Sequence, residues 1–133
     1  MNAVEWVNDV VGKPWQDRAY GPDSYDCWGL VIDSFSRVDN NPLHEVDGYA
    51  SGAPIEDAGQ AEELSGEWEE CSAEDGAVFC VYDNGLMVHV GRLFHVETQM
   101  YAIHSRGDGG QVQANTLRAI MRKYKSLKFF RRK

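Results

Sequence analysis

The sequence of 133 residues contains no apolar run near the ~20 residues that a membrane-spanning helix needs. Its first residues contain no basic stretch, and no apolar stretch follows them, so we expect no secretory signal. Cysteine is scarce: Cys27, Cys71 and Cys80 are odd in number and form no Cys-x-x-Cys pair. We therefore expect neither a disulfide framework nor a zinc site, and we assign no metal or cofactor. These features are typical of a chain made in a reducing cytoplasm.

Charge of one sign is missing from long parts of the chain. All 21 acidic residues lie at or before Asp108, whereas eight of the 13 basic residues lie between Arg118 and Lys133. Residues 1–117 thus carry a net charge of −16, and residues 118–133 carry +8. An acidic body of this kind repels phosphate backbones, so we do not expect nucleic acid as a partner.

The composition that remains, 43% hydrophobic and 26% charged, is that of one globular domain over residues 1–133. Helical spacing of apolar residues predicts a short helix over 3–11. A second helix should begin near Asp26, with either Asp26 or Ser24 as its N-cap. We interpret residues 39–75 as an ordered acidic excursion over the surface, with disorder as the competing interpretation. Within this excursion, residues 56–64 are a candidate short helix.

From residue 76 the apolar period changes to two, which indicates β-strands. Strands are expected over 77–82, 86–94, 100–105, 111–114 and 127–131, with a helix over 116–124. Asp83-Asn84-Gly85 predicts a hairpin turn between the first two strands. The fold class is therefore α+β, with N-terminal helices packed on an antiparallel β-meander.

Three residues of this pattern suggest chemistry. Cys27 lies in the first turn of the second helix, where free N–H groups and the helix dipole favour a thiolate. His89 lies in the middle of an apolar strand, and His104 lies near the end of the next strand. A lone cysteine or histidine in such a place is usually a packing residue, but the three together fit a thiolate nucleophile, a base and a group that orients the base.

The order of the short motifs resembles the NlpC-type family of cell-wall cysteine peptidases, which have a papain-like fold. The family pattern is Pro-Tyr, a glycine-rich loop with proline, Asp-Cys-Ser-Gly-Leu-Val, Gly-Asp-Leu-Val-Phe, His-Val-Gly and Ile-His-Ala. The corresponding segments of this chain are Pro14-Trp15, Gly21-Pro22, Asp26-Cys27-Trp28-Gly29-Leu30-Val31, Asp75-Gly76-Ala77-Val78-Phe79, His89-Val90-Gly91 and Ile103-His104-Ser105.

The resemblance implies that Cys27 is the nucleophile, His89 the general base and His104 the residue that orients His89. Trp15 stands where the family has a tyrosine, and the family's Gly-Gly is replaced around Arg18-Ala19. Trp15, Asp26 and Trp28 are the expected substrate-binding or oxyanion-side residues. The implied reaction is hydrolysis of an amide bond in peptidoglycan stem peptides.

Asp-Cys-Trp-Gly-Leu, followed by an acidic stretch with Gly48-Tyr49-Ala50, resembles the branch of this family found among bacteriophage tail proteins. The implied role is a tail-tip endopeptidase that aids cell-wall penetration and DNA entry. Such a protein would be made in the host cytoplasm, reside at the virion tail tip and act in the periplasm or cell wall. A structural tail module with little activity, and a thiol acyltransferase or amidase, are the alternatives.

The basic C-terminus suggests a further contact. If residues 127–131 form a strand, Arg131, Arg132 and Lys133 should project beyond the fold. We expect this cluster to dock an acidic surface of a neighbouring tail-tip protein, with an anionic wall polymer as the second candidate.

Overall fold

The computed structural model of the protein describes residues 1–43, 66–107 and 110–133. These residues form helices α1 (Ala3–Val10), α2 (Cys27–Arg37) and α4 (Leu117–Lys123), and strands β1 (Trp68–Cys71), β2 (Val78–Asp83), β3 (Leu86–Val96), β4 (Gln99–Ser105), β5 (Val112–Thr116) and β6 (Leu127–Arg132). The two N-terminal helices, the five expected strands and the C-terminal helix are confirmed. The candidate helix over 56–64 lies outside the described residues.

The six strands form one antiparallel sheet in the order β1-β6-β2-β3-β4-β5. Strands β2 to β5 follow one another as the expected meander. The last strand departs from it, because β6 returns to the far side and lies between β1 and β2. The expectation that the surface excursion extends to residue 75 was also wrong, since Trp68–Cys71 forms the edge strand β1 of the sheet. Its pairing partner lies about 60 residues further along, which local sequence does not indicate.

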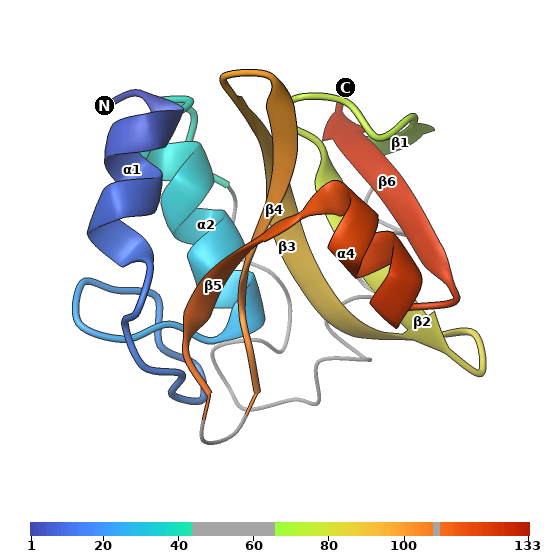
Figure 1. Cartoon of the computed structure of the whole chain (residues 1–133), viewed down its shortest axis with the longest axis horizontal. Coiled ribbons are helices and arrows are strands. Elements are labelled where there is room, and N and C mark those ends of the chain that lie inside the picture. Colours follow the sequence, from blue (N-terminus) through green and yellow to red (C-terminus); the bar gives the residue numbers. More distant parts are fainter. Residues whose placement is uncertain (44–65, 108–109) are drawn as a thin grey trace.

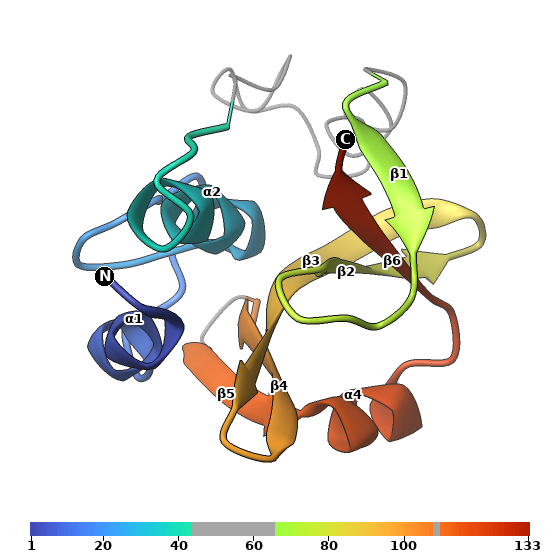
Figure 2. The same ribbon diagram turned by 90° about the horizontal axis from the view of Figure 1, so that it is seen from above.

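The helices lie on opposite faces of the sheet (Figures 1 and 2). Helices α1 and α2 lie side by side on one face, and α4 packs on the other. Side chains alternate between the two faces along each strand. Val78, Cys80 and Val90 therefore pack against Trp28, Val31 and Phe35 of α2, while Phe79, Leu93 and Ala102 pack against Ile120 of α4.

The hairpin between β2 and β3 has Asn84 and Gly85 as its two loop residues. Both have positive φ, 52° and 79°, which is the requirement of a type I′ turn. Further along, Val81 pairs with His89 while Tyr82 pairs with Met87, so Val88 is an extra residue in β3. This β-bulge changes the direction of the strand next to His89.

A buried arginine joins the helical layer to the sheet. The Arg92 guanidinium, 2% exposed, donates to both carboxylate oxygens of Asp39 at 2.9 and 2.8 Å. It also donates to Ser34 Oγ of α2 at 3.0 Å and to the Gly76 carbonyl at 2.9 Å. These contacts fix the end of α2 against the sheet. Losing them would leave a buried charge without a partner, which strongly destabilises a fold.

The basic C-terminus is part of the sheet, so the expectation that it projects beyond the fold was wrong. Arg131 and Arg132 pair in register with Glu69 and Trp68 of β1. The Arg131 side chain forms an ion pair with Glu69 at 2.9 Å, and Arg132 donates to the Asn41 carbonyl at 2.8 Å. Within the described residues no helix is both long and apolar enough to span a bilayer.

Candidate active site

The start of α2 is organised by the buried carboxylate of Asp26. Its Oδ1 accepts from the Gly29 N–H at 2.6 Å, so Asp26 rather than Ser24 is the N-cap. Its Oδ2 accepts from the Arg18 N–H at 2.9 Å. One side chain thus caps the helix and holds the preceding loop, which places Cys27 at the first helical position.

The loop over residues 13–25 lies directly against this helix end. A Cβ at Gly29 would collide with the Ala19 carbonyl, so the approach requires glycine. The Trp15 N–H donates to the Gly110 carbonyl at 3.0 Å. The buried Ser105 hydroxyl, beside His104 on β4, donates to the Tyr25 carbonyl at 2.6 Å. Ser105 therefore fixes the distance between the cysteine helix and the histidine strand, a role that the sequence did not reveal.

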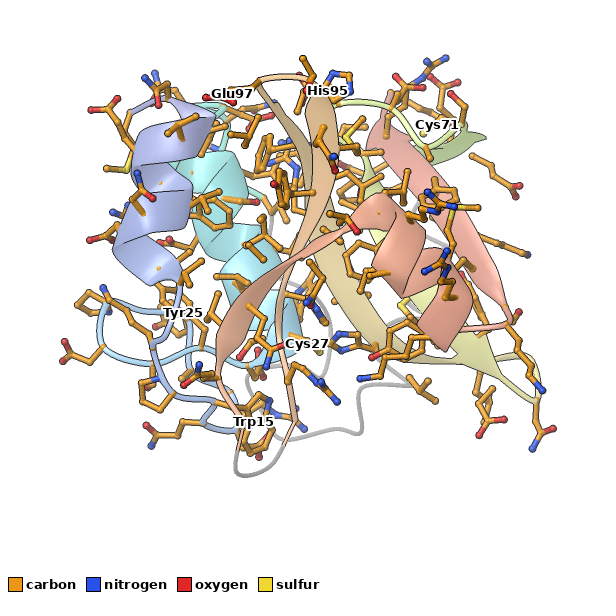
Figure 3. The ribbon with its side chains drawn as sticks, viewed as in Figure 1. Trp15, Tyr25, Cys27, Cys71, His95 and Glu97 are labelled. Carbon is orange, nitrogen blue, oxygen red and sulfur yellow. The ribbon has the colours of Figure 1, made fainter. Side chains whose placement is uncertain are left out.

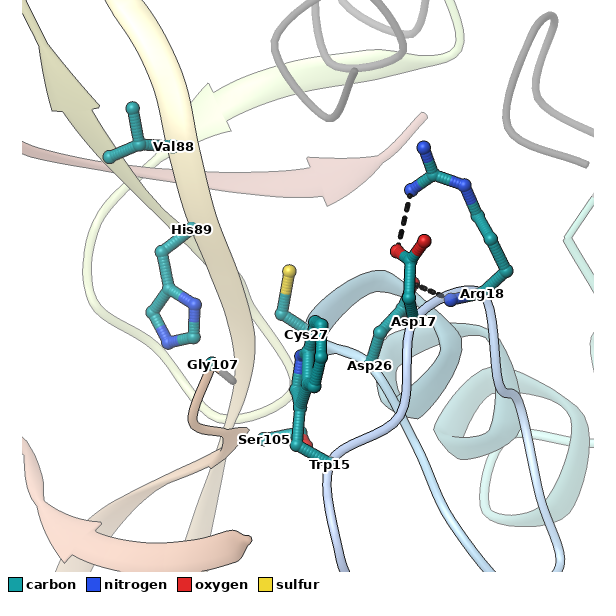
Figure 4. A pocket seen from close by; sticks show the side chains of 9 residues that line it. All are labelled: Trp15, Asp17, Arg18, Asp26, Cys27, Val88, His89, Ser105 and Gly107. Atoms are coloured by element: carbon teal, nitrogen blue, oxygen red, sulfur yellow. Dashed lines mark hydrogen bonds and ion pairs between the residues drawn. The ribbon is translucent and has the colours of Figure 1, made fainter. Parts of the chain in front are cut away.

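Cys27 and His89 share a pocket of about 260 Å³ (Figure 4). One edge of the His89 ring is turned toward the Cys27 side chain, whose sulfur points along the pocket, and the Trp15 ring lies beside Cys27. Among the residues that the structure describes, no hydrogen bond joins the Cys27 thiol to the His89 ring. The lining residues are Trp15, Asp17, Arg18, Asp26, Cys27, Val88, His89, Ser105 and Gly107.

A chain of hydrogen bonds leads from His89 into the protein. Nε2 of His89 lies 2.8 Å from Nδ1 of His104 on the neighbouring strand. Nε2 of His104 lies 2.7 Å from Oδ1 of Asn115 on β5. The fully buried Phe79 contacts both imidazoles edge to face, with centroid distances of 6.1 and 5.8 Å. The structure thus brings together the three residues expected from the sequence and adds Asn115, for which no sequence signal existed.

Burial determines the protonation of the pair. It raises the pKa of the Cys27 thiol to about 12, assisted by the nearby Asp26 carboxylate and opposed by backbone groups of Val90, Trp28 and Cys27. The expectation that the helix start lowers this pKa was therefore wrong for the free protein. Burial also lowers the pKa of His89 to about 3, with smaller contributions from His104, Arg106 and Lys123. The resting pair is a neutral thiol and a neutral imidazole.

The other candidate residues are distributed differently. Trp15 and Asp26 line the pocket, but Trp28 is 6% exposed and its ring packs in the core, so the expected contact of this ring with substrate is not supported. Cys80 is buried in the same core. Cys71 and His95 lie at the opposite end of the molecule from Cys27 and Trp15 (Figure 3).

Among the described residues, no three His, Cys, Asp or Glu side chains gather in a way that could hold a metal ion. The pocket itself contains a thiol, Cys27, and an imidazole, His89. A thiol, a neutral base and the N–H groups of a helix start are together able to transfer an acyl group.

No family model matches the sequence, and no curated protein matches it either. Solved structures do match the fold. The NlpC/p60 domain of the peptidoglycan hydrolase SagA has a TM-score of 0.61 and 16% identity, over 96% of this chain and 92% of that one. A putative xylanase from Bacteroides fragilis has a TM-score of 0.60 and 12% identity, over 96% and 99%.

An N-acetylmuramoyl-L-alanine amidase from Bacteroides uniformis has a TM-score of 0.59 and 11% identity, over 99% of both chains. At these identities the likeness concerns the fold and not the activity. The expected fold class is confirmed: this chain has the α+β, papain-like fold of an NlpC/p60 domain.

Proposed function

We propose that the protein is a cysteine endopeptidase that hydrolyses amide bonds in peptidoglycan stem peptides. One observation carries the proposal: Cys27, at the start of α2, and His89 line the same open pocket, and His89 lies within hydrogen-bond distance of His104. Two of the fold neighbours are named as a peptidoglycan hydrolase and an N-acetylmuramoyl-L-alanine amidase, which supports a cell-wall substrate.

The reaction begins from the neutral pair. As Sγ of Cys27 attacks the amide carbonyl carbon, its proton passes to the free nitrogen of His89. The oxyanion forms next to the N–H groups at the start of α2, which stabilise negative charge. His89 then gives the proton to the leaving amine as the C–N bond breaks. Water, deprotonated by His89, attacks the thioester and returns the thiol of Cys27.

The exposed carboxylate of Asp17, which it shares with Arg18, offers an acidic group to a substrate with a free amine, as a diamino acid has. Asp17 and Asp26 line the pocket next to Cys27, and Asp17 pairs with Arg18 at 3.3 Å. The exposed Asp17 carboxylate lies at the rim, where complementary charge steers a cationic group. In the family that the sequence resembles, the bond commonly cut joins γ-D-glutamate to a diamino acid.

The biological setting that we propose is the tail tip of a bacteriophage. It is supported by the resemblance of the segment around Cys27 to the tail-protein branch of the family. There the protein would open the wall locally, and its partners would be peptidoglycan and neighbouring tail-tip proteins. Immunogold labelling of intact virions tests this location, and label absent from the tail would contradict it.

A structural module of little activity is the second candidate. It is favoured by the raised pKa of Cys27 and by the lack of a hydrogen bond between Cys27 and His89. Digestion of purified sacculi, followed by mass analysis of the released fragments, separates the two. We expect new amine ends with the wild-type protein and with Cys71→Ala, and none with Cys27→Ala. Equal fragment yields from wild type and Cys27→Ala would exclude the peptidase, and transfer to an added amine would indicate an acyltransferase.

A further inference from the structure

We propose that Asn115 is a positioning residue that fixes the tautomers of His104 and His89, so that Nδ1 of His89 is the bare nitrogen that faces Cys27. The proposal rests on the proposed function only for its catalytic consequence. The tautomers themselves can be observed without substrate.

Asn115 is placed for this role by the register of the sheet. On β5 it lies opposite Ala102, while His104 lies opposite Gln113. The Asn115 side chain therefore reaches His104 along the strand direction, and its Oδ1 lies 2.7 Å from His104 Nε2. His104 is 1% exposed, so water does not replace this partner easily.

The amide oxygen determines where each proton resides. Oδ1 can only accept, so Nε2 of His104 must carry a hydrogen. A neutral imidazole has one N–H, so Nδ1 of His104 is bare and accepts. Nε2 of His89, at 2.8 Å, must then donate. Nδ1 of His89 is left without a hydrogen, as a general base requires.

The direction of the rings agrees with this assignment. Nε2 of His89 is engaged with His104, and Figure 4 shows the opposite side of the His89 ring turned toward Cys27. Phe79 restrains both rings by edge contacts but offers no polar atom, so it cannot choose a tautomer. Asn115 is the group at the end of the chain that can.

Burial is the main cause that lowers the pKa of both His89 and His104; the Asn115 hydrogen bond raises the pKa of His104, and two nearby cations lower the pKa of both rings. Arg106 follows the end of β4, and Lys123 of α4 lies 5.4 Å from the centre of the Tyr124 ring. That ring is in turn 6.0 Å from the His89 ring. Both cations oppose protonation of His89 and His104. With a second proton disfavoured, the single N–H on each ring must be placed by hydrogen bonding.

Two-bond ¹H–¹⁵N correlation spectra of the imidazoles at pH 7 test the assignment. We expect Nε2–H tautomers for both His89 and His104 in the wild-type protein. In Asn115→Leu this preference should be lost, whereas Gln113→Leu, the matched control on the same strand, should retain it. An Nδ1–H tautomer of His89 in the wild type, or unchanged spectra in a folded Asn115→Leu, would overturn the proposal.

A second variant covers the case in which Asn115→Leu fails to fold. In Asn115→Asp a carboxylate still accepts from Nε2, but its charge favours protonation of His104 on both nitrogens. Nδ1 of His104 would then donate to His89 and reverse its tautomer. We expect kcat/KM of Asn115→Asp to be near the wild-type value at high pH. As the pH falls and His104 becomes protonated, kcat/KM of this variant should decrease where that of the wild type does not. The same pH profile as the wild type would contradict the proposal.

The tautomer measurement and the activity measurement can fail independently of one another. If Asn115 acts as proposed, kcat of Asn115→Leu falls at least about 10-fold, toward the ~10⁴-fold that a wrong tautomer costs in a serine triad, with KM little changed. A wild-type protein with the assigned tautomers and no hydrolysis would refute the proposed function and leave the role of Asn115 intact. Hydrolysis by a protein with the opposite tautomers would support the proposed function and refute the role of Asn115.

Discussion

Nε2 of His89 and Nδ1 of His104 lie 2.8 Å apart, although they belong to different strands and are separated by 14 residues of chain. The antiparallel pairing of β3 with β4 brings them together. The bulge at Val88 lies next to His89, and both residues line the pocket that contains Cys27. The site is thus held by sheet geometry on one side and by a helix start on the other.

The buried His89 should make the fold sensitive to acid. Its pKa is about 3 in the folded chain and near 6.5 when unfolded, so the unfolded state binds the proton first as pH falls. The contribution of His89 to the free energy of unfolding is therefore complete above pH 6.5. It decreases toward pH 3, by on the order of 1 kcal/mol per pH unit. Urea titrations between pH 7 and pH 4 measure this slope.

Replacing the histidine tests that origin. His89→Asn should show a shallower decline of stability than the wild type over the same pH range. His95→Asn, at an exposed position of the same strand, is the matched control for the substitution itself. Identical slopes for wild type and His89→Asn would mean that His89 does not titrate in this way.

Alkylation reports the protonation of Cys27. Because its pKa is raised to about 12, the thiolate is scarce at neutral pH. The rate of modification of Cys27 by iodoacetamide, followed by peptide mass spectrometry, should rise steadily from pH 7 to pH 10. A fast rate that is constant below pH 8 would reveal a thiolate–imidazolium pair and contradict the neutral resting state.

Gly29 is expected to be essential for the loop that forms the pocket wall. In Gly29→Ala the new Cβ meets the Ala19 carbonyl, so either the loop or the helix must move. We expect a loss of more than about 2 kcal/mol in the free energy of unfolding. Gly107→Ala, where a Cβ meets no atom within 4 Å, should stay within about 0.5 kcal/mol. Equal, small effects would show that the close approach does not contribute to stability.

The C-terminus should stabilise the fold through its backbone. Deleting residues 131–133 removes the pairing of Arg131 with Glu69 and of Arg132 with Trp68. The Tm should fall by several degrees, and by clearly more than in a variant with alanine at all three positions, which keeps the ladder. Calorimetry on both variants measures the difference. An unchanged Tm after deletion would restore the idea of a projecting, docking terminus.

The sequence predicted most elements because their signals are local. The helix start at Asp26, the Asn84-Gly85 turn and the apolar alternation of the strands each depend on neighbouring residues. The strand β1, which the sequence did not predict, consists of Trp68-Glu-Glu-Cys, and its two acidic residues are typical of a loop. Its pairing with β6 comes from contacts about 60 residues apart, where Glu69 meets Arg131.

The site could be predicted only in part for the same reason. Cys27, His89 and His104 carry the motifs, whereas Asn115 is an ordinary polar residue in a short strand. Its role follows from a strand register that no local pattern specifies. The pKa of Cys27 was misjudged because the helix start is visible in the sequence, but the burial of the sulfur is not.

The central claim is that Cys27 carries the acyl group, and intact-mass analysis of a single turnover tests it most directly. The wild-type protein is mixed with a stem peptide, quenched at short times and weighed, and the modified residue is located by peptide mapping. We predict a transient adduct on Cys27 with the mass of the acyl part of the substrate, and neither adduct nor product with Cys27→Ala. Product formation by Cys27→Ala at the wild-type rate, or an adduct on another residue, would contradict the account.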